Sequence, residues 1–446
     1  MSIWRPINRV ALGANLGRRR RWLSTSRFNA NSTELPAFPG AVDSPYSSKM
    51  EWIVPAEKPR ISTFRVLNSE NKIDDPSQIT SEIPKDDIIK WYKNMLTVNI
   101  LDSIMFDAQR HGRVSFYMVS HGEEGLMVAS AAALGPGDVI TCQYREHGVF
   151  LQRGFELKDF MSQLTANLND PGKGRNMPNH YTGKAKVGAH SVASTLGPQI
   201  SHAAGAAYAL KMQDQEDPSN APRVAAAYFG EGAASEGDFH GALNMAAMMQ
   251  SPVIFICRNN GYAISTPSSE QYKGDGIASR GPGYGIETLR VDGTDVFAVY
   301  EATKAAREKA LENGGRPILL ELMSYRISHH STSDDSSAYR SSEEVALWRN
   351  SPQRNSILRL RQWLEHEGLW DAERDKGERA QIRKDIVKEL TLAEKEKKPA
   401  LRAIFEDVYA ELTEEAEAQR RELKRIMTKY PAEYDVNEHV GGIEGL

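Results

Sequence analysis

Short apolar runs and amphipathic stretches alternate through the middle of the chain. From Asp86 onward, apolar residues recur at the three- and four-residue spacing of a helix, at Ile88, Ile89, Tyr92, Met95, Leu96 and Ile100. Strand-like segments follow at residues 139–141, 224–229, 253–257 and 318–325, with helix-like segments between them. This alternation continues to about Leu322 and is the pattern of a parallel sheet flanked by helices. We therefore predict an α/β domain over residues 86–342.

The segments on either side of this domain have a different composition. Residues 34–85 are rich in Pro, Ser and Asn and hold only a short β-like piece at 62–67, so they predict an extended arm. Within the domain, residues 267–285 and 328–342 are glycine-rich or polar and predict loops. Residues 343–446 are highly charged, and the apolar face around Trp363 predicts a helical region whose first helices pack on the body.

The first 33 residues carry seven arginines and several serines, and no Asp or Glu occurs before Glu34. They also lack the apolar core of a secretory signal. This composition is typical of a mitochondrial transit peptide and predicts import into the mitochondrial matrix. A basic arm that binds nucleic acid or a membrane is the alternative.

The chain as a whole is close to neutral, with 446 residues, a net charge of −4 and 40% hydrophobic residues. This balance gives no electrostatic reason to expect nucleic-acid binding. No run reaches the roughly 18 apolar residues of a membrane span, so no membrane insertion is expected. Cys142 and Cys257 lie in apolar runs and predict buried thiols rather than a disulfide or a zinc site.

The segment from Gly230 to Asn260 holds the most specific pattern in the chain. An apolar strand runs into Gly230-Glu231-Gly232, a helix-like segment and a second strand follow, and the segment ends at Asn259-Asn260. Glycines after a strand let a ligand approach the backbone, and a following helix N-terminus attracts phosphate. Glu231 and Asn260 add oxygen ligands of the kind that magnesium takes when it bridges a diphosphate. The pattern predicts a metal-bridged diphosphate cofactor.

Other interpretations of this segment fit less well. A GxGxxG dinucleotide site has a glycine where this chain has Ser235, and no acidic residue ends the second strand, although Arg258 suits a phosphorylated dinucleotide. A P-loop requires a Gly-Lys-Ser/Thr sequence, which does not follow here. A glycine- and alanine-rich turn with solvated acids is the simplest alternative.

Two more segments carry candidate functional groups. Residues 143–146 follow a strand, and Arg145 together with Arg258 could neutralise a diphosphate, with exposed ion pairs as the alternative role. The loop 328–335 contains His330, which could move a proton near neutral pH, with a purely structural role as the alternative. A phosphate on Ser331 would add about two negative charges to this loop.

The segment that begins Gly-Glu-Gly and ends Asn-Asn resembles the thiamin diphosphate and magnesium motif of thiamin-dependent enzymes. Further motifs extend the resemblance over roughly residues 86–410, to the alpha subunits of the mitochondrial branched-chain 2-oxoacid dehydrogenases. These motifs are QYRE at Gln143, GEGAASEGD at Gly230, CRNNGYAISTP at Cys257, RGPGYGI at Arg280, RVDGTDVFAVY at Arg290 and YRISHHSTSDDSSAYR at Tyr325. Pyruvate dehydrogenase alpha subunits share the architecture but usually carry Gly-Asp-Gly and a different final loop.

The resemblance implies a thiamin diphosphate-binding fold in which this chain holds the diphosphate end of the cofactor. Magnesium would be ligated by the side chains of Glu231 and Asn260 and by the backbone oxygen of Tyr262. His330 is the expected catalytic residue, and Phe116 matches an aromatic residue of the substrate pocket. The cofactor would contact Gln143, Tyr144, Arg145, Ser194, Leu196, Gly230, Glu231, Gly232, Ala233, Arg258, Asn260 and His330.

The implied reaction is the oxidative decarboxylation of branched-chain 2-oxoacids, such as 3-methyl-2-oxobutanoate, in branched-chain amino acid degradation. The acyl group would pass to the lipoyl arm of an acyltransferase component. In this family the glutamate that activates the cofactor lies on a beta subunit, which implies an α2β2 heterotetramer and an inactive isolated chain. Ser331 and Ser341 match phosphorylation sites, which implies a regulatory kinase and phosphatase. A pyruvate dehydrogenase-type alpha subunit and a noncatalytic cofactor-binding subunit are the alternatives.

One loop departs from the family pattern. The family's potassium-binding loop reads Ser-Ser-Pro-Leu-Ala-Thr-Gln, whereas residues 193–199 read Ala-Ser-Thr-Leu-Gly-Pro-Gln. Two hydroxyl ligands are replaced, by Ala193 and Pro198. The departure puts a potassium ion at this loop in doubt, and with it the way the loop stays ordered.

Overall fold

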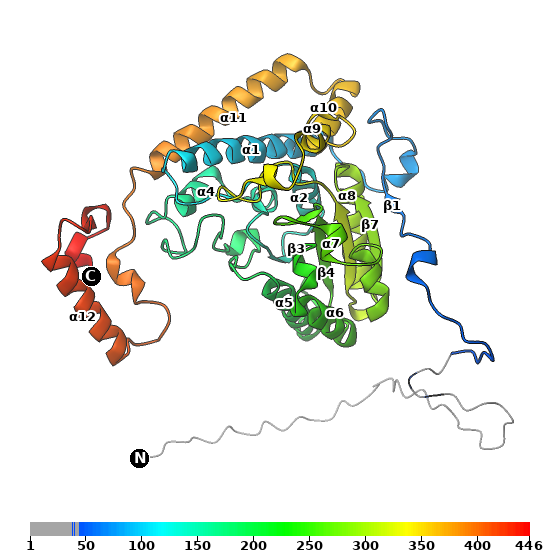
Figure 1. Ribbon diagram of the computed structural model, residues 1–446, viewed down its shortest axis with the longest axis horizontal. Helices are drawn as coiled ribbons and strands as arrows, with labels where there is room; N and C mark the ends of the chain where they lie inside the picture. The colour runs from blue at the N-terminus through cyan, green and yellow to red at the C-terminus, as the bar shows by residue number, and fades with distance from the viewer. Residues whose placement is uncertain (1–37, 39, 41–43) are drawn as a thin grey trace. The chain divides into compact units, whose positions relative to one another are not determined.

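The computed structural model describes residues 38, 40 and 44–446 (Figure 1). The predicted transit peptide, residues 1–33, therefore lies outside the described residues. The chain divides into two compact units between Pro55 and Ala56, and the second unit, Ala56–Leu446, contains the sheet and every α-helix described below. The domain limits drawn from composition, at 33, 85 and 342, stay a prediction.

A six-stranded parallel sheet forms the centre of the second unit, in the order β1-β7-β8-β4-β3-β2. A separate antiparallel pair consists of β5 and β6. The strands are β1 Thr63–Phe64, β2 Val139–Thr141, β3 Ala225–Gly230, β4 Val253–Asn259, β5 Tyr262–Ala263, β6 Thr266–Pro267, β7 Glu287–Asp292 and β8 Ile318–Met323. The predicted parallel α/β sheet is therefore confirmed, and the β-like piece at 62–67 supplies its edge strand.

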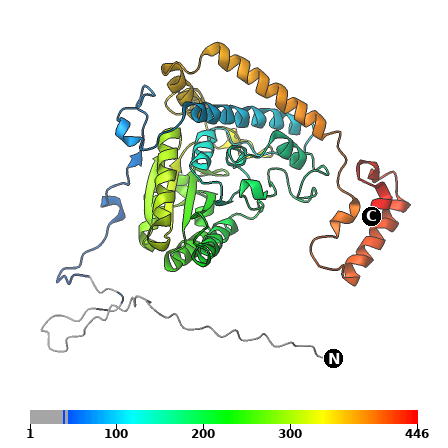
Figure 2. The ribbon, with the colours of Figure 1, turned by 180° about the vertical axis from the view of Figure 1, so that it is seen from behind.

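Helices cover both faces of the sheet (Figures 1 and 2). They are α1 Lys85–Arg110, α2 Glu124–Ala132, α3 His147–Gln152, α4 Leu157–Leu164, α5 Pro198–Glu216, α6 Gly237–Met249, α7 Ser268–Gln271, α8 Val296–Leu311, α9 Ser342–Asn350, α10 Ser356–His366, α11 Ala372–Ala393 and α12 Glu414–Lys429. On one face α5 packs against β2, β3 and α6. On the other, α8 packs against β7 and β8, α2 packs on α8, and α1 runs beside α11.

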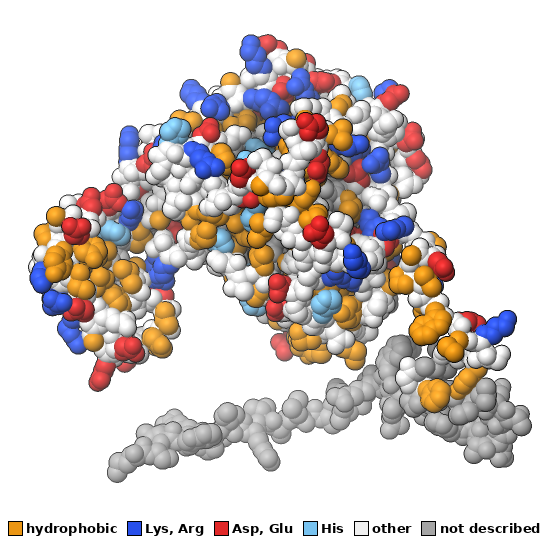
Figure 3. All heavy atoms as spheres, in the orientation of Figure 1, with side chains coloured by type: hydrophobic (Ala, Val, Ile, Leu, Met, Phe, Trp, Pro, Cys, Tyr) orange, Lys and Arg blue, Asp and Glu red, His pale blue; other side chains and the backbone are white. Residues whose placement is uncertain are grey.

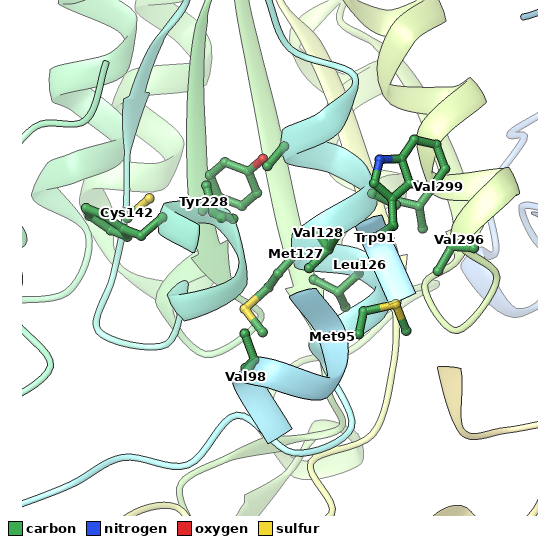
Figure 4. Packing of buried hydrophobic residues seen from close by; sticks show 14 of the residues in the cluster. Trp91, Met95, Val98, Leu126, Met127, Val128, Cys142, Tyr228, Val296 and Val299 are labelled. Carbon is green, nitrogen blue, oxygen red and sulfur yellow. The ribbon is translucent and has the colours of Figure 1, made fainter. Parts of the chain in front are cut away.

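The two faces are built by the alternation of side chains along the strands. In β3, Ala226 and Tyr228 join the larger apolar cluster, whereas Ala227 and Phe229 join the smaller one. Both central strands, β3 and β4, are almost entirely buried, which explains why they read as continuous apolar runs. Figure 4 shows α1, α2 and α8 contributing Met95, Leu126 and Val296 to the larger cluster.

The predicted loop at 267–285 contains more regular structure than its composition indicates. It includes α7 and a 3-10 helix at Ala278–Tyr284. The buried carboxylate of Glu321 accepts hydrogen bonds from the backbone N–H groups of Ile277 and Ala278, at 2.9 and 3.0 Å. These hydrogen bonds fix the start of the 3-10 helix, and their acceptor lies on a strand far along the chain. The local composition of residues 267–285 therefore could not reveal them.

The C-terminal segment differs from the rest of the unit in its surface. Trp363 and Leu364 of α10 are buried in the larger cluster, as their apolar face predicts. In contrast, α12 has no buried residue. Figure 3 shows hydrophobic side chains gathered on the surface of this segment, and Ile404, Val408 and Tyr409 are 58%, 75% and 61% exposed. Within the described residues, no helix is both long and apolar enough to span a membrane.

Candidate active site

Four neighbouring strands of the sheet end at one cavity. Gln143 follows β2, Glu231 follows β3, Asn260 follows β4 and Arg326 follows β8. Because all four strands are parallel, their carboxyl ends meet at one edge, where ligands of open α/β sheets bind. The cavity has a volume of about 230 Å³. It is lined by Gln143, Tyr144, Arg145, Leu196, Gly230, Glu231, Gly232, Ala233, Glu236, Arg258, Asn260, Tyr262, Ala263, Ile264, Gln271, Arg326 and His330.

Glu231 is a buried carboxylate with one uncommitted oxygen. Its Oε2 accepts a hydrogen bond from the backbone N–H of Asn260 at 3.2 Å, whereas its Oε1 has no hydrogen-bond partner among the described residues. Burial, with a smaller contribution from the nearby charge of Glu123, raises the pKa of Glu231 to about 7. A cation beside Oε1 would satisfy this oxygen and favour the ionised form, so the environment of Glu231 fits a metal ligand.

The other two predicted metal ligands lie beside Glu231 but are already hydrogen-bonded. The side-chain Oδ1 of Asn260 accepts from the backbone N–H of Tyr262 at 3.2 Å. The backbone oxygen of Tyr262 accepts from Nη1 of Arg326 at 3.3 Å. Each of these oxygens has a second lone pair that a metal could use. No group of three or more His, Cys, Asp or Glu side chains forms a metal site in the described part of the chain.

Arg258 is held by carboxylates and is not free to act as a bare cation. Its Nη1 donates to Glu123, its Nε lies 2.5 Å from Oε1 of Glu146, and its Nη2 donates to Oε1 of Gln143 at 3.1 Å. Burial disfavours the charged guanidinium, but Glu146 and Glu123 outweigh this effect and raise the pKa of Arg258. No local sequence pattern indicates that two carboxylates neutralise this arginine at the cavity.

Of the two predicted arginines, Arg145 is the one whose charge is less neutralised by nearby carboxylates. It positions His330. Its Nη2 lies 3.1 Å from Nδ1 of His330 and donates to the His330 backbone oxygen at 3.0 Å. Because arginine can only donate, Nδ1 must accept, and the ring proton therefore resides on Nε2. Burial, together with the charges of Arg145 and Arg326, lowers the pKa of His330 to about 2, so the ring is neutral near pH 7.

Gln143, Gly230 and Gly232 form the part of the cavity wall where the diphosphate is expected to bind. Oε1 of Gln143 accepts from the backbone N–H of Gly230 at 3.0 Å. Its Nε2 is buried without a partner among the described residues and is available to a ligand oxygen. A Cβ on Gly232 would lie 2.7 Å from the Cβ of Ala263, so the wall admits only glycine there without a shift. These donors and this close backbone approach fit a phosphate group.

Not every predicted site residue reaches the cavity. Leu196 lines it, but Ser194 is exposed and Phe116 is half-buried, and neither is among the described residues that line it. The loop before α5 ends at Gly197, which has a φ of 103°, and Pro198 begins the helix. The roles of Ser194 and Phe116 stay predictions.

The two predicted phosphorylation sites occupy different environments. Ser331 is 6% exposed, and its Oγ accepts from the backbone N–H of Ser333 at 3.2 Å. Asp334 lies on the same turn and accepts from the backbone N–H of His330 at 2.7 Å. Ser341 is exposed and caps α9 by accepting from the backbone N–H of Glu344 at 3.1 Å. A phosphate on Ser331 would thus meet Asp334, whereas one on Ser341 would meet a helix N-terminus.

The comparisons with known proteins agree with this geometry. A model of the family described as "Dehydrogenase E1 component" matches residues 92–402. The chain belongs to the dehydrogenase E1 component family. Membership of the E1 component family implies the use of thiamin diphosphate.

Three relatives show how far the likeness to E1 components extends. The chain is 48% identical over 404 residues to "2-oxoisovalerate dehydrogenase subunit alpha, mitochondrial" of Mus musculus, covering 91% of this chain and 89% of that protein. It is 46% identical over 439 residues to the Macaca fascicularis protein of the same name, covering 98% and 94%. It is 48% identical over 404 residues to the Homo sapiens protein of that name, covering 91% and 88%.

Proposed function

We propose that this chain is the alpha subunit of a mitochondrial branched-chain 2-oxoacid dehydrogenase. Its reaction is the oxidative decarboxylation of branched-chain 2-oxoacids, with transfer of the acyl group to a lipoyl arm. The observation that carries the proposal is the cavity where β2, β3, β4 and β8 end, because it gathers the predicted cofactor residues of four separate segments. The high identity to alpha subunits named for 2-oxoisovalerate supports the substrate class.

The proposed cofactor complex is thiamin diphosphate with magnesium. Glu231 would supply the ionised ligand through Oε1, while Asn260 and Tyr262 would supply neutral oxygens. One carboxylate with neutral oxygens and phosphate oxygens is a common environment for magnesium. Nε2 of Gln143, which has no partner among the described residues, is an available donor for the diphosphate, and the positive charge of Arg145 lies in the same cavity wall. We do not extend the proposal to potassium at 193–199, where two hydroxyl ligands are replaced.

The chain's own residues would orient the reactants and donate a hydrogen bond to them. Thiamin diphosphate, when bound, supplies the electron sink for decarboxylation. Arg145 holds His330 in the tautomer with a proton on Nε2, and the low pKa of the ring keeps it neutral. His330 can therefore donate a hydrogen bond from Nε2 to an acceptor in the cavity during acyl transfer. Ser194, Leu196 and Phe116 are proposed to complete the cofactor and substrate walls.

The proposed assembly is an α2β2 heterotetramer in the mitochondrial matrix that works with a lipoyl-bearing acyltransferase. The family and the names of the relatives support a beta subunit and a mitochondrial location. A kinase and a phosphatase acting at Ser331 and Ser341 are a further part of the proposal. Neither nucleic acid nor a membrane is proposed as a partner.

Co-expression with the beta subunit tests the proposal directly. Decarboxylation of 3-methyl-2-oxobutanoate and of pyruvate should be measured side by side with a dye acceptor, with the isolated chain as the control. We expect kcat/KM to favour the branched substrate and the isolated chain to be inactive. A preference for pyruvate would instead identify a pyruvate dehydrogenase-type subunit. Cofactor binding without turnover of either substrate would identify a noncatalytic subunit.

A further inference from the structure

Glu123 is a fully buried carboxylate that contacts three residues of the cavity. Its side chain is 0% exposed. Oε2 accepts from Nη1 of Arg258, Oε1 accepts from Nδ2 of Asn260 at 2.9 Å, and Oε1 lies 3.8 Å from Nε of Arg145. Although it immediately precedes α2, its side chain makes no capping hydrogen bond to that helix. Its hydrogen bonds are therefore directed to the site rather than to its own helix.

The contact with Asn260 decides which way the amide of Asn260 points. An amide has a donor end and an acceptor end of nearly the same shape, and its neighbours select between the two orientations. An ionised carboxylate can only accept, so Glu123 requires the NH₂ group of Asn260 to face it. Oδ1 then faces away from Glu123, toward the backbone N–H of Tyr262. The oxygen, and not the nitrogen, is thus available to a metal.

We propose that Glu123 is a positioning residue that presents Oδ1 of Asn260 to the metal ion. The inference rests on the proposed function, because it takes Asn260 as a magnesium ligand. Glu123 does not itself reach the cavity wall, since the described residues that line the cavity do not include it. It acts through hydrogen bonds behind the ligand, and such partners typically change metal affinity by about 10–100-fold.

The Glu123→Gln substitution makes this role testable. The new amide has nearly the same volume, but only one of its ends can accept a hydrogen bond. Arg258 can only donate, so it captures the new amide oxygen. The new NH₂ group then faces Asn260. To accept from it, the amide of Asn260 must turn, so that its oxygen faces residue 123 and its nitrogen faces the metal. Because Arg258 keeps its contact with Glu146, the substitution does not leave that arginine without a carboxylate.

Glu124→Gln is the matched control. Glu124 is the adjacent residue, is 1% exposed and also accepts hydrogen bonds, from Nδ2 of Asn99 and the backbone N–H of Gly122, each at 2.8 Å. It makes no hydrogen bond to a residue of the cavity among those described. If loss of a buried carboxylate only weakens the fold, both substitutions should lower metal affinity by similar amounts. If positioning is the cause, only Glu123→Gln should do so.

A double substitution supplies a rescue. In Glu123→Gln with Asn260→Asp, the new NH₂ group can donate to one oxygen of the new carboxylate. The other carboxylate oxygen is then available to the metal. The pair keeps the net charge and nearly the volume of the original pair. If Glu123→Gln weakens metal binding by disturbing the packing, the second substitution should not restore the affinity. If the cause is the orientation of the Asn260 amide, it should.

The experiment uses the enzyme assembled with its beta subunit. Binding of Mn²⁺ in place of Mg²⁺ is measured from the signal of free Mn²⁺ in electron paramagnetic resonance, at saturating thiamin diphosphate. We expect Glu123→Gln to raise the Kd for Mn²⁺ by about 10–100-fold, Glu124→Gln to change it less than threefold, and the double variant to recover most of the loss. Unchanged affinity in Glu123→Gln, or equal losses in both single variants, would overturn the inference.

Asn260→Ala separates this inference from the proposed function on which it rests. If Asn260→Ala weakens Mn²⁺ binding while Glu123→Gln does not, the metal site stands and the positioning role of Glu123 is wrong. If Asn260→Ala binds Mn²⁺ as tightly as the wild type, Asn260 is not a ligand, and both the metal assignment and the inference fail.

Discussion

At the scale of single residues, several buried polar atoms of the cavity residues lack a hydrogen-bond partner in the described part of the chain, and two of them belong to predicted cofactor ligands and differ in kind. These two are Oε1 of Glu231 and Nε2 of Gln143. Native proteins rarely leave buried acceptors and donors unsatisfied, because each costs about 1–3 kcal/mol. One is an acceptor suited to a cation and the other a donor suited to an anion. Together they match a metal ion bound to a diphosphate.

Glu231→Ala should abolish magnesium-dependent binding of thiamin diphosphate, because it removes the only ionised ligand proposed for the metal. Calorimetry of the assembled enzyme measures the cofactor Kd. Glu236→Ala is the control, since Glu236 also lines the cavity but is exposed. A cofactor affinity within about threefold of the wild type, or ~0.7 kcal/mol, would contradict the role assigned to Glu231.

His330→Ala should reduce acyl transfer to lipoyl groups by about 10²–10³-fold, the usual cost of removing one positioned hydrogen-bond donor. Decarboxylation with a dye acceptor should be measured alongside lipoyl acylation, to separate the two steps. His329→Ala is the control for loop order, because Nδ1 of His329 accepts from the backbone N–H of Ser336 at 2.9 Å. Equal losses in both variants would assign His330 a structural role.

His147 should make the stability of the fold depend on pH. It is 0% exposed, and burial lowers its pKa to about 4, against about 6.5 in an unfolded chain. The unfolded chain therefore binds the proton more readily. The stabilisation is complete above pH 6.5 and is lost as the pH falls from 6.5 to 4, by about 3 kcal/mol in all.

Denaturant unfolding at several pH values tests this prediction. Between pH 4.5 and 6, His147→Gln should remove up to about 1.4 kcal/mol per pH unit from the slope of unfolding free energy against pH. His111→Gln, at an exposed position on the surface, is the matched control for the change of side chain. If the slope of unfolding free energy against pH is the same in His147→Gln as in the wild type, protonation of His147 is not linked to unfolding.

At the scale of elements, the loop between β8 and α9 links the cofactor to regulation. It carries His330 into the cavity and holds Ser331 in a buried position beside Asp334. The hydrogen bonds from His330 and from the Tyr339 hydroxyl, at 2.7 and 2.6 Å, both end on Oδ2 of Asp334. Asp334 is therefore one of the groups that hold the loop, and a nearby phosphate would repel its carboxylate.

Phosphorylation of Ser331 should disorder this loop and lower activity while the subunits remain assembled. Protease nicking between Ser328 and Arg340, with and without cofactor, reports the order of the loop. Phosphorylation of Ser341 is the contrast, because a phosphate at the N-cap of α9 is favoured by the helix dipole. Unchanged nicking and unchanged lipoyl acylation after full phosphorylation of Ser331 would contradict the switch.

The sequence predicted those elements whose signals are local. The apolar runs of β3 and β4 were recognisable because both faces are buried, and Glu231 and Asn260 were recognisable because they directly follow these strands. Glu123 was not predicted, since it lies 135 residues from Arg258 and 137 from Asn260 in sequence. The pairing of β1 with β7 likewise joins distant segments. Such contacts follow from tertiary packing, which no local pattern records.

At the scale of the whole molecule, the C-terminal segment exposes an apolar surface without a covering element in the described residues. Val408 and Tyr409 are 75% and 61% exposed. Exposed apolar clusters of this kind often mark protein–protein contacts. The family implies a beta subunit, so we expect this surface to be covered in the assembled enzyme.

Val408→Asp with Tyr409→Asp should weaken assembly with the beta subunit without unfolding the chain. Burying an apolar side chain of this size in an interface stabilises the complex by about 1.5–3 kcal/mol, and the charged substitutes would lose this stabilisation. Sedimentation of the co-expressed subunits measures assembly, and circular dichroism measures the fold. Glu411→Ala, in the same segment, removes an exposed charge without apolar area and should assemble normally. Normal sedimentation of the double variant would place the contact elsewhere.

The edge strand β1 limits how much of the N-terminus a processing protease can remove. The backbone N–H of Ile61 donates to Asp275 at 2.6 Å, and those of Val66 and Leu67 donate to Asp295 at 3.0 and 2.6 Å. Asp295 also caps α8, so these residues join the helix start to the sheet edge. Trimming past Ile61 would remove the first of these donors, and further trimming would strip β1 from the sheet and leave Asp295 without the N–H groups of Val66 and Leu67. Maturation must therefore spare the chain from Ile61 onward, whatever bond is cut upstream.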